Sequence, residues 1–94
     1  MAKYDKPENV KYMQAQIEAT IATLAHLFDI KNEQLSQIEM PRFCFCHFQD
    51  NYRPETNEIW MEPEGITPYR ISSIVAEFLY CTVNPDIFRQ QHEL

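Results

Sequence analysis

The chain has 94 residues, enough for one domain with a single hydrophobic core and too few for two. Fourteen acidic and eight basic residues give a formal net charge of −6, which argues against binding nucleic acids or anionic membranes, because both require a basic surface. A single glycine excludes the glycine-rich loops that hold phosphate groups. The charge permits a basic protein as partner, and solubility alone is the alternative reason for it.

The first predicted element is a helix that begins at Pro7, because proline is favoured in the first helical turn. Apolar residues follow at spacings of three and four, which is typical of one buried helix face: Val10, Met13, Ile17, Ile21, Leu24 and Phe28. A second face carries small and aromatic residues. We predict that this face packs against another copy of the chain through Tyr12, Ala15, Ala19, Ala22 and His26. The high helix propensity of alanine is the alternative reason for this composition.

The segment Arg42 to Gln49, RFCFCHFQ, is predicted as a β-strand because it is rich in aromatic residues. Alternation along a strand places Cys44 and Cys46 on one face and His47 on the other. The three side chains would then be unable to bind one metal ion together. We expect the two thiols to pack beneath a helix, as buried cysteines commonly do.

A loop and a second strand are predicted next. Residues 49–56 have the composition of a connecting loop, and Glu58 to Glu62 reads as a strand with Ile59 and Met61 on one face and Trp60 on the other. Two strands joined by a short loop predict an antiparallel β-hairpin.

The last long helix is predicted to begin at Thr67 and Pro68, a capping hydroxyl followed by proline. Its apolar face comprises Ile71, Ile74, Val75, Phe78, Leu79 and Cys81. Asn84 and Pro85 repeat the start signal and predict a short terminal helix. The predicted fold is therefore a single α+β domain over residues 1–94, in the order α-β-β-α.

The strand NEIWM followed by the helical segment AEFLY resembles, in element order, the core of the small zincin metallopeptidases. In that family an edge strand precedes a helix carrying His-Glu-x-x-His. Glu77 stands where the general base would be, but the two zinc-binding histidines fall on Ala76 and Tyr80, which do not bind zinc. The resemblance implies a relic of that shape without its activity. An alternative function is therefore a metal-binding protein or degenerate metallohydrolase that uses a histidine or the thiols of Cys44, Cys46 and Cys81.

The segment from Asp50 to Glu64 carries five acidic residues and one arginine, and we expect Tyr52 in its loop and Trp60 on its strand to be exposed. Trp, Tyr and Arg are enriched in the hot spots of protein interfaces, and carboxylates complement a basic surface. We predict that a partner is contacted by Tyr52, Arg53, Glu55, Glu58, Trp60 and Glu62. A solvated hairpin whose Trp60 packs on a helix is the alternative.

Together these patterns favour a non-enzymatic interaction protein without a cofactor. It would occupy a basic surface on a protein that handles nucleic acid, as a phage or mobile-element inhibitor of a host defence protein does. The first ten residues lack the apolar stretch of a signal peptide and the cysteine number is odd, so we expect reduced thiols and a cytoplasmic location. A further alternative is an oligomer that binds a small molecule between copies, near Tyr69 and Tyr80.

Overall fold

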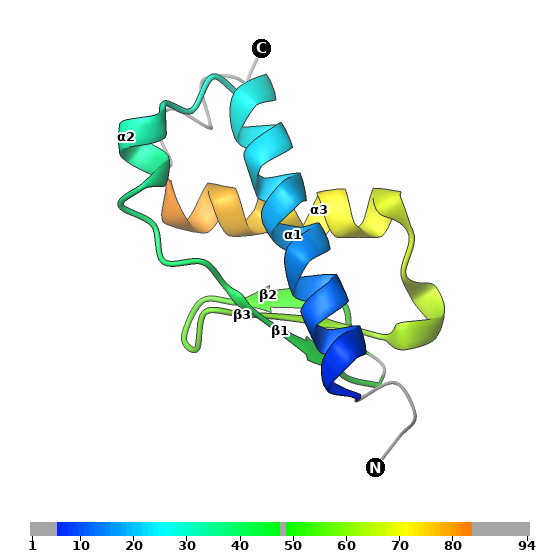
Figure 1. The fold of residues 1–94 in the computed structure, drawn as a ribbon. Helices are drawn as coiled ribbons and strands as arrows, with labels where there is room; N and C mark the ends of the chain where they lie inside the picture. The colour runs from blue at the N-terminus through cyan, green and yellow to red at the C-terminus, as the bar shows by residue number, and fades with distance from the viewer. Residues whose placement is uncertain (1–5, 48, 84–94) are drawn as a thin grey trace.

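The structure, a computed structural model, describes residues 6–47 and 49–83 of the chain. The elements follow in the order α1 (Pro7–Leu27), α2 (Asn32–Leu35), β1 (Arg42–Phe45), β2 (Asn51–Arg53), β3 (Glu58–Met61), the 3-10 helix η2 (Pro63–Gly65) and α3 (Pro68–Thr82). The α+β class predicted from the sequence is confirmed (Figure 1). The terminal helix predicted from Asn84 lies outside the described residues.

The two long helices begin and bury residues largely as their sequences predict. α1 has Pro7 in its first turn, and its fully buried residues recur every four positions at Met13, Ile17, Ile21 and Ala25. α3 begins after Thr67, whose hydroxyl accepts a hydrogen bond from the Arg70 backbone N–H at 3.2 Å. This side-chain bond satisfies one of the N–H groups that a helix start leaves unpaired.

The sheet differs from the prediction. It has three strands in the order β1-β3-β2, with β1 parallel to β3 and β2 antiparallel to β3. The predicted antiparallel hairpin of residues 42–49 with residues 58–62 is therefore wrong. The physical reason is that residues 51–53, expected in a loop, form the strand that pairs with β3 across a tight turn. Asn57 in that turn has φ of 54°, a left-handed conformation that asparagine tolerates.

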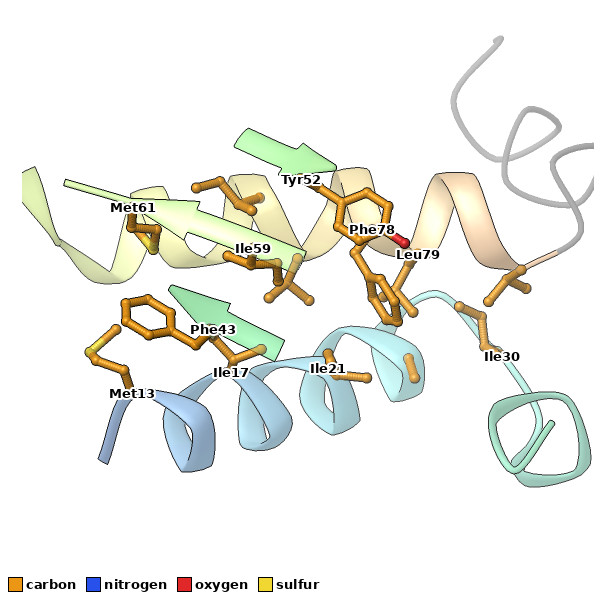
Figure 2. Packing of buried hydrophobic residues seen from close by; sticks show 14 residues of the cluster. Met13, Ile17, Ile21, Ile30, Phe43, Tyr52, Ile59, Met61, Phe78 and Leu79 are labelled. Atoms are coloured by element: carbon orange, nitrogen blue, oxygen red, sulfur yellow. The ribbon is translucent and has the colours of Figure 1, made fainter. Parts of the chain in front are cut away.

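Both long helices lie on the same face of this sheet, and the core fills the space between them (Figures 1 and 2). The sheet contributes Phe43, Tyr52, Ile59 and Met61, while the helices contribute Ile17, Ile21, Phe78 and Leu79 among others. The predicted alternation along β3 is confirmed, since Ile59 and Met61 are buried and Trp60 points to the other face. Cys81, which was placed on the apolar face of α3, is exposed instead.

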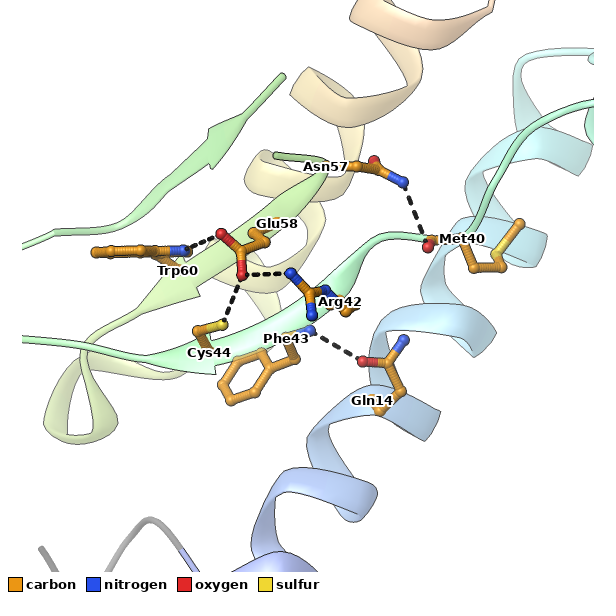
Figure 3. A network of polar contacts seen from close by, with 8 residues as sticks. All are labelled: Gln14, Met40, Arg42, Phe43, Cys44, Asn57, Glu58 and Trp60. Carbon is orange, nitrogen blue, oxygen red and sulfur yellow. Dashed lines mark hydrogen bonds and ion pairs between the residues drawn. The ribbon is translucent and has the colours of Figure 1, made fainter. Parts of the chain in front are cut away.

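The Gln14 side chain connects α1 to the outer edge of β1 (Figure 3). Its carboxamide oxygen accepts a hydrogen bond from the Phe43 backbone N–H at 2.9 Å, and its nitrogen donates to the Pro41 carbonyl at 2.7 Å. The amide thus takes the place that a neighbouring strand would take. An edge occupied in this way is protected against pairing with another chain at these groups.

At the opposite end of the sheet, Asp50 connects the start of β2 to α3. Its carboxylate forms an ion pair with Arg70 and accepts a hydrogen bond from the Glu62 backbone N–H at 2.9 Å. Gly65 leaves room for this arrangement, because a Cβ atom there would lie 2.7 Å from Nη1 of Arg70. The glycine, the arginine and the aspartate therefore form one local unit at the start of α3.

Candidate partner-binding face of the sheet

One face of the sheet is covered by neither long helix (Figure 1). Alternation along the three strands and their register place six side chains on it, and we call this surface the open face: Arg42, Cys44, Asn51, Arg53, Glu58 and Trp60. Five of the six are only partly exposed, while Arg42 is exposed, and contacts with Glu58 or Trp60 connect Arg42, Cys44 and Arg53. The open face is therefore a structured set of contacts and not a row of independent solvated side chains.

Glu58 lies at the centre of the open face, on the middle strand. In the register of the sheet it is opposite Arg42 on β1 and opposite Arg53 on β2. Nη2 of Arg42 lies 3.1 Å from Oε2 of Glu58, where the arginine side chain is 75% exposed and the glutamate side chain 14% exposed. The open solvent around Arg42 screens this ion pair and keeps it weak.

Two further donors converge on the same carboxylate (Figure 3). The thiol of Cys44 donates to Oε2 of Glu58 over 3.4 Å, and the indole N–H of Trp60 donates to Oε1 over 3.4 Å. Hydrogen bonds from Thr56 and Cys44 lower the pKa of the Glu58 carboxyl, with smaller contributions from Trp60 and the Arg42 charge. Glu58 is consequently a carboxylate at neutral pH, and its side chain connects β3 to β1.

The Trp60 ring carries a cation on its face. The guanidinium carbon of Arg53 lies 3.8 Å from the ring centroid, well within the range of a cation–π contact. Nη2 of Arg53 also donates to Oε1 of Gln49 at 2.8 Å, whereas its Nε is shielded from water and has no hydrogen-bond partner. Among the described residues, no carboxylate forms an ion pair with Arg53.

The acidic residues of the segment from Asp50 to Glu64 divide into two groups. Asp50 and Glu58 are already paired with arginines of the chain itself. Within the described part of the chain, Glu55, Glu62 and Glu64 form no ion pair, and all three retain exposed surface. The negative charge available to a partner therefore lies at the two ends of the β2–β3 hairpin, flanking the open face.

The expectation that Tyr52 is exposed in a loop is wrong. Its side chain is only 4% exposed, its ring packs edge-on against Phe78 at a centroid distance of 5.2 Å, and its hydroxyl donates to Oδ1 of Asn57 at 2.8 Å. Tyr52 belongs to a strand and points toward the helices, so it is a core residue. The partner roles predicted for Arg53, Glu55, Glu58, Trp60 and Glu62 stay predictions.

The cysteines also lie elsewhere than expected. Cys44 is on the open face and not beneath a helix, because Phe43 is the residue of β1 that enters the core. Cys46 donates its thiol to the Gln49 carbonyl at 2.9 Å. Burial raises the pKa of both thiols, and the hydrogen bond with Glu58 raises that of Cys44 further. In the described ranges, no group of three His, Cys, Asp or Glu side chains is arranged to hold a metal ion.

The residues predicted for self-association lie along one exposed line of α1: Tyr12, Ala15, Ala19, Ala22 and His26. Their spacing alternates between three and four, the spacing of a coiled-coil seam. Tyr12 is 64% exposed, and the line is on the side of the helix away from the core. Self-association stays a prediction. Tyr69 and Tyr80, proposed to line a pocket between copies, are both exposed on α3.

The chain was compared with protein-family models, curated proteins and solved structures, and nothing matched in any of the three. Over residues 6–47 and 49–83, none of the helices combines the length and the apolar character needed to cross a lipid bilayer.

Proposed function

We propose that the protein is a non-enzymatic interaction module that binds the basic surface of another protein through the open face of its sheet. The observation that carries the proposal is Trp60, the only tryptophan of the chain, which is held on a sheet face that neither long helix covers. Tryptophan is among the residues most enriched in interface hot spots. A partly exposed tryptophan within a fixed polar network is a suitable central contact for such an interface.

The charge around Trp60 favours a basic partner. Glu55, Glu62 and Glu64 flank the open face without an ion pair inside the described chain, and the whole protein carries a net charge of −6. Such carboxylates accelerate association with a surface of opposite charge and repel acidic ones. Proteins that handle nucleic acid carry basic surfaces of this kind, so a natural role would be to mask one of them.

A binding experiment with basic probes tests this function. A fluorescently labelled arginine- and serine-containing peptide is titrated with the protein, with a glutamate- and serine-containing peptide of equal length as the control. We expect binding of the basic peptide alone, with weaker binding to Trp60→Leu and Glu62→Lys. Glu33→Lys makes the same change in charge on α2, away from the sheet, and should have a smaller effect. Equal losses in Glu33→Lys and Glu62→Lys would show attraction by net charge only and would contradict the proposed surface.

A further inference from the structure

The Arg53 guanidinium forms no ion pair with a carboxylate of residues 6–47 or 49–83, although the chain is acidic overall. In the sheet register it lies directly opposite Glu58, yet Glu58 pairs with Arg42 from the other neighbouring strand. The Arg53 guanidinium instead covers the face of Trp60 at 3.8 Å. The Trp60 ring therefore binds a cation in the free protein, and that cation is one of the chain's own side chains.

The contact holding Arg53 in place is incomplete. Of its donors, Nη2 is bonded to Gln49, but Nε is shielded from water and makes no hydrogen bond. A polar group that is removed from water without a partner opposes the conformation that buries it. If Arg53 turns away from the ring, Nε regains water, and the chain loses only the stacking contact and one hydrogen bond to an exposed glutamine.

The following inference rests on the proposed function. We propose that Arg53 is a placeholder, meaning that it occupies the Trp60 ring only in the free protein, and that the partner's arginine or lysine side chain displaces it. The incoming cation would lie on the same ring face, beside the Glu58 carboxylate whose Oε1 lies 3.4 Å from the indole nitrogen. An aromatic face with an adjacent carboxylate is suited to a guanidinium or ammonium group. Arg53 then lowers the affinity of the free protein for cations and is not itself a contact of the complex.

The displacement is tested by whether one substitution raises or lowers the affinity for the peptide. Removing the Arg53 cation by Arg53→Gln should make the labelled arginine peptide bind about three- to tenfold more tightly, because the competitor for the ring is gone. The substitution also makes the protein more negative by one charge. Lys31→Gln makes the same change on the exposed residue before α2 and serves as the matched control. The gain expected for Arg53→Gln is measured relative to Lys31→Gln.

Three outcomes are distinguishable. Tighter binding by Arg53→Gln than by Lys31→Gln, together with at least about tenfold weaker binding by Trp60→Leu, supports the placeholder. Weaker binding by both Arg53→Gln and Trp60→Leu means that Arg53 contacts the partner, which overturns the placeholder and leaves the proposed function standing. Binding unaffected by Trp60→Leu, or no binding of the basic peptide, overturns both.

The tryptophan supplies an independent readout of where the peptide binds. Trp60 is the sole tryptophan, so a change in its emission on addition of the arginine peptide reports an event at the open face. In Arg53→Gln the emission of the free protein should already differ from that of the parent protein. Circular dichroism and urea unfolding of Trp60→Leu establish that a loss of binding is not a loss of fold.

Discussion

Arg53 and Glu58 are opposite one another on neighbouring strands, yet they do not form an ion pair. Glu58 instead binds Arg42, Cys44 and Trp60, while Arg53 stacks on Trp60. Their opposite charges and their register would predict an ion pair between the two residues, with no cation on the Trp60 indole ring. The observed arrangement concentrates polar contacts on Glu58 and leaves the cation on the aromatic ring.

The central position of Glu58 predicts an acid-sensitive contribution to stability. Its pKa is lower in the folded chain than its ordinary value, through the hydrogen bonds from Thr56 and Cys44. The stabilisation is therefore fully present above the unfolded value of about 4.3 and is lost as the pH falls through the folded pKa. The difference in unfolding free energy between the parent and Glu58→Gln should be largest near neutral pH and shrink toward about pH 3.

Urea unfolding at a series of pH values measures this difference. The exposed glutamate of α2, replaced in Glu33→Gln, supplies the baseline for a carboxyl with no ion pair inside the described chain. A parent-minus-Glu58→Gln difference that is flat across the same pH range would contradict the role given to Glu58.

The Cys44 thiol should become more reactive when Glu58 loses its charge. Burial raises its pKa, and the Glu58 carboxylate raises it further both as hydrogen-bond acceptor and as a nearby charge. Since the thiolate is the reactive form, Glu58→Gln should speed alkylation of Cys44 by about two- to tenfold near pH 8. Peptide mapping by mass spectrometry after timed iodoacetamide treatment assigns the rate to each cysteine.

The other two thiols provide the control in the same sample. Cys46 bonds to a backbone carbonyl, and Cys81 lies on α3, so neither contacts Glu58 in a hydrogen bond. Equal acceleration at all three positions would indicate partial unfolding, and an unchanged rate at Cys44 would contradict its bond to Glu58.

Tyr52 should behave as a core residue and not as a contact residue. Tyr52→Ala removes a ring packed on Phe78 and should cost about 3–5 kcal/mol of stability. Tyr52→Phe keeps the ring but leaves Oδ1 of Asn57 without its donor, which should cost about 1–3 kcal/mol. Urea unfolding of both variants measures these losses. Changes in unfolding free energy within about 0.5 kcal/mol, the usual range for surface substitutions, would indicate that Tyr52 is a surface residue.

The burial of Tyr52 illustrates which parts of the fold were accessible from the sequence. Helix limits and the faces of β3 follow from local signals: prolines at two helix starts, apolar spacing of three to four, and alternation around Trp60. The strand at residues 51–53 was not predicted because Asn51 and the flanking Asp50 and Pro54 are typical of turns. A three-residue strand becomes stable only when a partner strand and a helix are present, and short-range patterns do not contain that information.

The composition of the open face was partly predictable for the same reason. Trp60, Glu58 and Arg53 stood out by residue type, whereas Arg42 and Cys44 join them because β1 pairs with β3 and turns Phe43 toward the helices. Short-range patterns do not contain this pairing, because β2 separates the two strands in the chain. Within β1 Phe43 and Cys44 alternate as predicted, but the face that meets the helices was assigned the wrong way round, since Phe43 supplies more apolar surface than a thiol.

Gln14 should be important for the attachment of α1 to β1. Gln14→Leu removes the partner of the Phe43 N–H and of the Pro41 carbonyl, and should cost about 1–3 kcal/mol. Gln14→Glu retains an acceptor for the N–H but has no donor for the carbonyl, so a smaller loss is expected. Urea unfolding measures both. A Gln14→Leu variant as stable as the parent would show that water replaces the amide at this edge.

Self-association through α1 is the remaining expectation, and one substitution tests it. Ala19 is the central residue of the exposed line, so Ala19→Glu would place a carboxylate where two copies approach most closely. Light scattering should give a multiple of the 11.2 kDa chain mass for the parent and the single-chain mass for Ala19→Glu. Lys31→Gln makes the same change in charge outside α1, on the exposed residue before α2, and should keep the parent's mass. A parent protein that is a single chain at every concentration measured would contradict the expectation, and a loss of assembly in Lys31→Gln as well would attribute it to net charge and not to the alanine line.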